Sequence, residues 1–151
     1  MKKYELTSET KIVFGHILYR IKALSSFGYV SAGDLGGFLE SEKNLSQNGN
    51  AWVSGNAWVS GNAEVSGDAR VSEIGAIFWI GAVGSRNDTA TFFRCRDGSI
   101  KVVCGCFFGN LDEFAKKVRK THGDNDHAKV YMLAIDMAKI RISTEKEKTE
   151  E

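Results

Sequence analysis

A six-residue alternation of apolar and polar positions runs through the middle of the chain. Residues 50–71 read NAWVSG, NAWVSG, NAEVSG and DARV. Each hexad has two apolar positions spaced two residues apart, so both point to the same side of an extended strand. The positions expected to point inward are Ala51, Ala57, Ala63 and Ala69, with Val53, Val59, Val65 and Val71. A short strand followed by a Gly-Asn or Gly-Asp corner, repeated in this way, predicts a β-solenoid and not a helix.

The same phase extends beyond the obvious repeat. Ile77 and Val83 continue the valine positions. The small inner position is continued by Gly75 and Gly81 downstream and by Leu45 upstream. We therefore expect hexads over residues 45–84. A solenoid of this length cannot bury a core alone, so both of its ends require a cap or a partner chain.

The segment before the repeat, residues 1–44, predicts an N-terminal β cap and an irregular first coil. Ile12–Phe14 and Ile17–Leu24 flank Gly15-His16, which indicates a hairpin. The Gly-Asp-Leu-Gly-Gly run at residues 33–37 predicts tight turns. We expect the aromatic residues of this segment to plug the open end of the solenoid.

The segment after the repeat, residues 85–142, predicts two strands and two helices. TATFFRC and SIKVVCGCF flank Arg96-Asp97-Gly98, a hairpin signal. Asn110 and Glu113 predict a capping box at the start of a helix that ends at Gly123. Asp124-Asn125 predicts the start of a second helix, which runs to about Ile142. Residues 143–151, STEKEKTEE, contain no apolar residue and are expected to form a disordered tail.

The hexads resemble the hexapeptide-repeat left-handed β-helix family, in which three hexads form one triangular turn. The phrases GSRNDTATFF, VVCGCFFGNLDEF and THGDNDHAKVY resemble a C-terminal capping domain found in phage- and prophage-encoded proteins of Firmicutes, and DLGGFLESEKNLSQNGNAWV resembles their leader. The resemblance implies a mainly β protein with C-terminal helices. Its centre would be a short left-handed β-helix of about two coils, capped by an N-terminal β-hairpin layer and a C-terminal ββαα unit.

Charge and cysteine content indicate which partners and which cellular compartment to expect. The formal net charge of +1 gives no electrostatic reason to expect nucleic acid or a membrane as partner. No apolar run is long enough to span a bilayer. Three cysteines, two of them only two residues apart, make a disulfide framework improbable. We expect a reduced, cytoplasmic protein, in the host cell if the gene belongs to a phage.

Catalysis is the least favoured interpretation. Hexapeptide-repeat acyltransferases use a histidine between subunits as general base, whereas no histidine occurs here between Ala23 and Thr121. About two coils are also short for an acyl-CoA tunnel. No Walker loop or dinucleotide fingerprint is present. We therefore expect no catalytic residue and no cofactor.

A zinc site is an open alternative. Cys95, Cys104, Cys106, His122 and His127 would supply enough soft ligands. However, the chain has no C-x-x-C pair, and small buried core thiols explain the cysteines equally well. We therefore expect that no metal binds.

The candidate binding residues lie after the repeat. They are Arg86 and Asn87 in the turn that follows the last hexad, and His122 and Asp124 at the helix junction. Arginine binds phosphate or carboxylate in a bidentate way, and a helix start offers free N–H groups to an anion. The alternative is that Arg86 pairs with Asp88 or Asp112 on the surface. Arg94, Arg96 and Lys101 are expected to converge on the same region once the chain folds.

Two tryptophans are candidates for an interface. Trp52 and Trp58 take the outward position of their hexads, and exposed Trp indicates a contact surface. We expect a homo-oligomer, either a dimer or a trimer. The alternative is that they pack beneath the N-terminal hairpin or a C-terminal helix.

Together these patterns predict a non-catalytic binding protein. The favoured hypothesis is a phage-encoded inhibitor that binds a bacterial defence protein or its nucleotide signal. A phage structural or assembly scaffold is the alternative, and an acyltransferase-like enzyme comes third.

Overall fold

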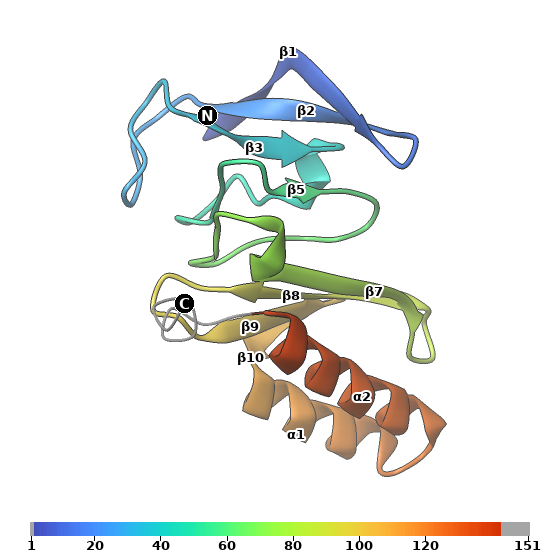
Figure 1. The fold of residues 1–151 in the computed structure, drawn as a ribbon. Coiled ribbons are helices and arrows are strands. Elements are labelled where there is room, and N and C mark those ends of the chain that lie inside the picture. Colours follow the sequence, from blue (N-terminus) through green and yellow to red (C-terminus); the bar gives the residue numbers. More distant parts are fainter. Residues whose placement is uncertain (1, 143–151) are drawn as a thin grey trace. The chain divides into compact units, whose positions relative to one another are not determined.

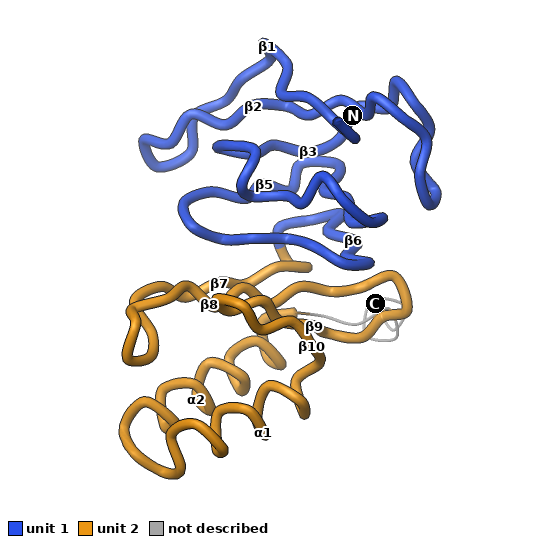
Figure 2. Tube along the Cα trace, turned by 180° about the vertical axis from the view of Figure 1, so that it is seen from behind, with its two compact units in different colours: residues 1–74 blue, residues 75–151 orange. Residues whose placement is uncertain are grey.

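The computed structural model describes residues 2–142. The chain forms two compact units, an N-terminal unit of residues 1–74 and a C-terminal unit of residues 75–151 (Figure 2). The fold is mainly β, and its two α-helices follow the last strand (Figure 1). This confirms the expected coarse fold class. None of the helices in residues 2–142 is long and apolar enough to cross a membrane. The expected disordered tail lies outside the described residues.

The N-terminal unit begins with the expected hairpin. Strands β1 (Tyr4–Val13) and β2 (His16–Ala23) pair in antiparallel fashion, and β3 (Leu35–Leu39) pairs antiparallel with β2. The hairpin turn is Phe14-Gly15, with φ of 48° and 83°. It lies one residue earlier than predicted. Two positive φ values are typical of a type I′ turn, whose twist matches that of the flanking strands.

The hexads form short strands that pair in parallel. They are β4 (Trp52–Val53), β5 (Trp58–Val59) and β6 (Arg70–Val71). β4 pairs with β6, β5 pairs with β3, and an isolated bridge joins Leu45 to Val65. All eight Ala and Val positions predicted to point inward are at most 1% exposed. The predicted phase of residues 50–71 is therefore confirmed.

The hexad pattern does not continue to its expected ends, although Leu45, Ile77 and Val83 are buried as predicted. Leu45 pairs with Val65, which places it among the valine positions and not the alanine positions. Downstream, Ile77–Val83 form one continuous strand, β7, with an antiparallel partner, and Gly81 is exposed. The sequence IFWIGAV contains no Gly-Asn or Gly-Asp corner, so the chain continues as one strand, with a β-bulge between Ile80 and Val83 where Ala82 has a φ of 56°.

Trp52 is buried, contrary to the expectation of an exposed interface. Its side chain is 2% exposed and contacts the rings of Tyr4 and Phe27 edge-on, with centroid distances of 6.4 and 5.4 Å. The outer face of β4 is therefore covered by the segment before the repeat, which is the alternative that the sequence left open. Trp58 is half-buried and lies opposite Phe38 in the β3–β5 pair.

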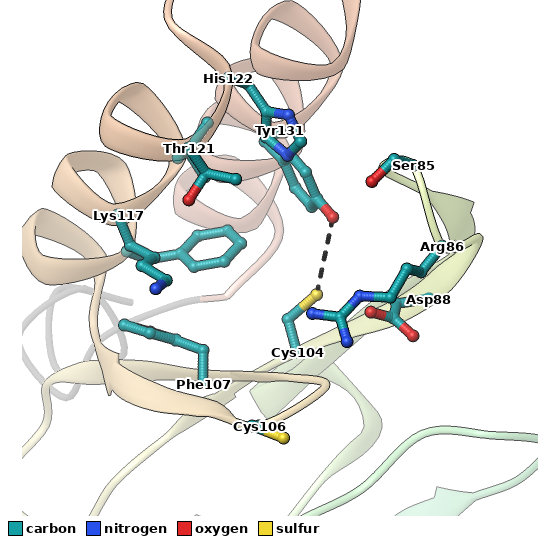
Figure 3. Close-up of a pocket in the computed structure, with 12 residues that line it drawn as sticks. Ser85, Arg86, Asp88, Cys104, Cys106, Phe107, Lys117, Thr121, His122 and Tyr131 are labelled. Atoms are coloured by element: carbon teal, nitrogen blue, oxygen red, sulfur yellow. Dashed lines mark hydrogen bonds between the residues drawn. The ribbon is translucent and has the colours of Figure 1, made fainter.

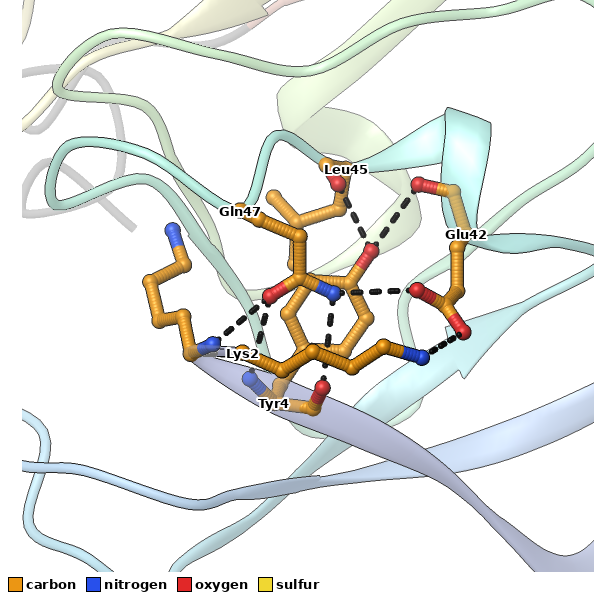
Figure 4. A network of polar contacts seen from close by, with 6 residues as sticks. Lys2, Tyr4, Glu42, Leu45 and Gln47 are labelled. Atoms are coloured by element: carbon orange, nitrogen blue, oxygen red, sulfur yellow. Dashed lines mark hydrogen bonds and ion pairs between the residues drawn. The ribbon is translucent and has the colours of Figure 1, made fainter.

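A polar network fixes Tyr4 against the loop that precedes the hexads (Figure 4). The Tyr4 hydroxyl lies 2.6 Å from the Leu45 carbonyl oxygen and 3.0 Å from that of Glu42. The Gln47 side chain accepts from the Lys3 N–H at 2.7 Å and donates to the Glu42 carboxylate at 3.2 Å. These contacts hold the N-terminal strand over the Trp52 ring.

The expected tight turns at Gly36 and Gly37 are absent from the described chain, because both residues lie inside β3. A Cβ at Gly36 would lie 2.6 Å from the Val53 carbonyl oxygen, and one at Gly37 would lie 2.5 Å from that of Ala57. These glycines let the hexad backbone approach β3 closely.

The C-terminal unit is a four-stranded antiparallel sheet with two helices on one face (Figure 1). Its strands run in the order β10-β9-β8-β7, with β8 Asp88–Arg94, β9 Ile100–Cys104 and β10 Phe107–Asn110. The unit is therefore ββββαα and not ββαα. The chain assigned to the last hexads adds β7, and the predicted second strand folds back at Gly105 to give β10.

The helices begin where the sequence predicted. Helix α1 spans Leu111–His122, and Asn110 and Glu113 exchange the two hydrogen bonds of a capping box, at 2.8 and 2.9 Å. Helix α2 spans Asp126–Arg141, and the Asn125 side chain accepts from the Ala128 N–H at 3.0 Å. The stripe of α2 that faces the sheet is buried: Tyr131, Ala134, Ile135, Ala138 and Ile142. It packs with Phe92 and Phe114 into one core.

Candidate functional site

The C-terminal unit contains a pocket of about 400 Å³ between its helices and the turns of its sheet. Figure 3 shows side chains from α1, α2 and two strand turns that point toward one another around Cys104. The lining residues are Ser85, Arg86, Asp88, Cys104, Cys106, Phe107, Phe114, Lys117, Val118, Thr121, His122 and Tyr131. This volume is within the range of roughly 300–1,000 Å³ that is typical of small-molecule sites.

The β7–β8 turn supplies Arg86 and its neighbours. Gly84 and Asn87 adopt positive φ values of 76° and 54°, and the Asn87 N–H donates to the Gly84 carbonyl at 3.2 Å. A Cβ at Gly84 would clash with the Tyr131 hydroxyl. The turn can therefore lie against α2 only because residue 84 lacks a side chain, and this contact places Arg86 at the pocket.

One face of α1 supplies the opposite wall. Phe114, Lys117, Val118 and Thr121 follow the i, i+3, i+4, i+7 spacing of a single helical face and all line the pocket. Phe114 and Val118 are buried, whereas Lys117 is exposed at the rim. The apolar floor and the cationic rim therefore come from the same helix.

Tyr131 stands at the centre of the site. Its ring stacks on His122 with a centroid distance of 5.8 Å, and its hydroxyl lies 4.0 Å from the Cys104 sulfur. Burial raises the pKa of Tyr131 to about 12 and also raises the pKa of the Cys104 thiol. At neutral pH both groups keep their protons, so they offer neutral polar contacts to a ligand and no thiolate.

The charged lining is predominantly cationic. Arg86 and Lys117 are cations, His122 can become one, and Asp88 is the single carboxylate that lines the pocket in the described chain. Within residues 2–142, no ion pair or hydrogen bond joins the Arg86 side chain to another residue. The expected alternative, a pair with Asp88 or Asp112, therefore does not form.

Two of the four predicted binding residues meet at this pocket. Arg86 and His122 both line it, although 36 positions separate them in the sequence. Asn87 and Asp124 are exposed in neighbouring turns and do not line it. The expected convergence of Arg94, Arg96 and Lys101 is also wrong, because none of them lines the pocket.

Lys117, Tyr131 and Phe107 are lining residues that sequence reasoning did not select. Lys117 could have been identified from the sequence, because its spacing places it on the same helical face as Phe114 and Thr121. No local pattern identifies Tyr131, because its position on the buried stripe of α2 is that of a core residue.

The possible zinc ligands are only partly brought together. Cys104, Cys106 and His122 line the pocket, whereas Cys95 is buried elsewhere. Within residues 2–142, no group of three His, Cys, Asp or Glu side chains is arranged to hold a metal ion. The pocket lining contains two cations, hydroxyl groups and aromatic rings.

No protein-family model and no curated protein sequence matches this chain. The interpretation of the pocket therefore depends on its own geometry.

Proposed function

We propose that this protein is a non-catalytic binding protein that takes a small phosphate-bearing organic ligand in the pocket of its C-terminal unit. The observation that carries the proposal is that Arg86 and Lys117 reach the same pocket from two different elements, with Asp88 as the only lining carboxylate among the described residues. Two cations on separate supports can bind one anionic group from two sides.

The apolar part of the pocket favours a ligand that also carries a ring. Three aromatic rings that line the pocket, Phe107, Phe114 and Tyr131, form a chain of contacts, with Phe114 at 5.2 Å from Phe107 and 5.5 Å from Tyr131 between ring centroids. Aromatic side chains bind the flat face of a base or another ring by stacking. A nucleotide combines a ring with a phosphate and fits both features.

The raised pKa of the Cys104 thiol supports a binding role without catalysis. A nucleophilic cysteine needs a lowered pKa, whereas burial raises the pKa of Cys104. The neighbouring Tyr131 hydroxyl has a pKa raised to about 12 and is not a general base at neutral pH.

In biological terms, we propose that the ligand is the nucleotide signal of a bacterial defence system. The protein would then be a phage-encoded inhibitor that sequesters this signal in the host cytoplasm. This setting comes from the resemblance of residues 34–53 and of three C-terminal phrases to phage and prophage proteins. We also propose that the hexads form a short left-handed β-helix, which the parallel pairing of Trp52 with Arg70 supports.

Isothermal titration calorimetry tests the ligand class. The probes are inorganic phosphate, adenosine, adenosine monophosphate and a cyclic dinucleotide. We expect the two nucleotides to bind more tightly than phosphate, and adenosine to bind weakly, since both the ring and the charge contribute. Equal affinity for adenosine and the nucleotides would contradict a cationic site.

A protein partner at the β1–β2 hairpin tip is the second candidate. Ile12, Phe14 and Ile17 are exposed apolar residues at this tip, and Phe14 is 93% exposed with a φ of 48°. A large aromatic held in a strained turn resembles a hot-spot anchor. Affinity capture from bacterial lysate with wild-type protein and with Phe14→Asn tests it. A host protein retained by both variants would contradict a role for the tip.

A phage structural or assembly module remains the alternative to an inhibitor. A structural module would assemble into large particles, whereas a sequestering inhibitor acts as a small soluble complex. Size-exclusion chromatography with light scattering in the presence of a cyclic dinucleotide separates these possibilities.

A further inference from the structure

Helix α2 is apolar on two opposite sides. One side carries Tyr131, Ile135 and Ala138 and packs into the core of the C-terminal unit. The other side carries Val130, Leu133, Met137 and Ile140, which are 41, 62, 44 and 85% exposed. These four residues, the outer stripe, follow the spacing i, i+3, i+7, i+10. That spacing is the a and d pattern of a two-stranded coiled coil.

A contiguous exposed apolar stripe of this kind indicates a contact surface. The remaining segment of this chain beyond α2, residues 143–151, reads STEKEKTEE and has no apolar side chain to place on the outer stripe. Residues 143–151 therefore do not supply an apolar cover for the outer stripe.

We propose that the outer stripe is the interface between two copies of this chain, which pair their α2 helices in parallel about a twofold axis. Val130 and Met137 occupy a positions, and Leu133 and Ile140 occupy d positions. In the first heptad, Val130 at a with Leu133 at d is the combination that favours two parallel strands. Each side chain then packs against its own counterpart in the second copy.

The flanking charges select the parallel orientation. In this heptad frame Asp136 is a g residue and Arg141 is the e residue five positions later. A g residue faces the e residue of the next heptad in a parallel partner, so Asp136 meets Arg141 of the second copy, twice by symmetry. In an antiparallel pair with the four apolar layers matched, the two Asp136 side chains would face each other instead, which is repulsive.

The outer stripe is short, so the dimer is expected to be weak. Two heptads form a smaller contact than the roughly 800 Å² per partner of a standard interface. The helices are already folded on the sheet, so less conformational entropy is lost than in a free peptide. A Kd on the order of 100 µM follows from a contact of this kind.

Sedimentation equilibrium from about 5 to about 500 µM tests the proposal. The wild-type chain is expected to shift from monomer to dimer over this range. Leu133→Lys and, separately, Ile140→Lys are expected to weaken the dimer at least about tenfold. Leu35→Lys is the matched control, because Leu35 is an exposed apolar residue on a different element, β3. A monomer throughout, or a dimer that survives both α2 variants, would overturn the proposal.

Two further variants test the orientation. Asp136→Arg and Arg141→Asp are each expected to weaken the dimer, and the double variant is expected to restore it. In a Cys106→Ser background, Leu133→Cys is expected to form a self-crosslink under mild oxidation, because d residues face each other in a parallel pair. A double variant as weak as the two single variants, together with no crosslink at Leu133→Cys, would exclude the parallel pairing.

Discussion

Val53 and Val71 lie opposite each other in a parallel strand pair, and both side chains are fully buried. Their residue numbers differ by 18, which is three hexads. After three hexads the chain therefore lies beside its own earlier strand. Equivalent positions of the repeat are neighbours in the two paired strands. The spacing of the valines in the sequence thus predicts which side chains are buried, and substitutions at these positions test the prediction.

Val59→Asp is expected to unfold the N-terminal unit, whereas Glu64→Lys is expected to have little effect. Val59 is fully buried and Glu64 is exposed. An unpaired charge inside the repeat lowers the free energy of unfolding by several kcal/mol, compared with less than about 1 kcal/mol for a surface change. Thermal denaturation followed by circular dichroism measures both variants. Similar melting temperatures would show that the inward and outward assignment is wrong.

Gly37→Ala is expected to destabilise the N-terminal unit by about 2–4 kcal/mol. The new Cβ would lie 2.5 Å from the Ala57 carbonyl oxygen, so β3 could not keep its parallel pairing with β5. Gly81→Ala is the control, since its Cβ would meet Thr89 Oγ1 at an ordinary 3.6 Å. Chemical denaturation measures both. An equal loss in the two variants would argue against the close approach of β3.

The free energy of unfolding is expected to rise between pH 8 and pH 10. Lys3 Nζ is buried and donates to the Ala51 carbonyl at 2.9 Å, and burial lowers its pKa from 10.5 to about 8. In this window the unfolded chain still holds the proton that the folded chain has released, so raising the pH favours folding, by on the order of 1 kcal/mol.

Above pH 10 the trend is expected to reverse. Burial raises the pKa of Tyr4 and Tyr131, so the unfolded chain loses protons that the folded chain retains. Urea denaturation at successive pH values measures the profile, and Lys3→Met should remove the rise. Stability that falls steadily from pH 8 in the wild-type protein would contradict the assignment.

Phe14→Asn is expected to stabilise the protein by about 0.5–1 kcal/mol. Phe14 has a φ of 48° in the hairpin turn and is 93% exposed, so the substitution relieves strain and loses no packing. Asn is favoured at this position of a type I′ turn. Phe14→Leu is the control, because it keeps the strain. A lower melting temperature for Phe14→Asn would mean that the Phe14 ring makes a stabilising contact.

Periodicity and capping signals predicted much of the fold. The two-residue spacing of Ala and Val identified the buried side of the hexads, and Asn110, Glu113 and Asn125 marked the helix starts. These signals work because they are local. Alternation shows which side a residue takes but not whether that side is covered, so Trp52 was expected to be exposed.

The pocket was predicted only in part for the same reason. Arg86 and His122 were recognised from residue type and from their turns. Lys117 and Tyr131 join them through the packing of α1 and α2 on the sheet, and no short sequence segment encodes that packing. The α2 sequence contains two apolar stripes, and the outer one was not recognised from the sequence.

The central claim is that Arg86 and Lys117 bind an anionic ligand in the pocket of the C-terminal unit. Calorimetry with adenosine monophosphate and a cyclic dinucleotide on Arg86→Ala and Lys117→Ala tests it most directly, with Lys120→Ala as control, because Lys120 is an exposed α1 cation that does not line the pocket. We expect each pocket variant to weaken binding by about 1.5–3 kcal/mol at an unchanged melting temperature, and the control to bind like the wild type. Full binding in Arg86→Ala and His122→Ala, with loss in Trp58→Ala, would contradict the claim and place the site on the hexads.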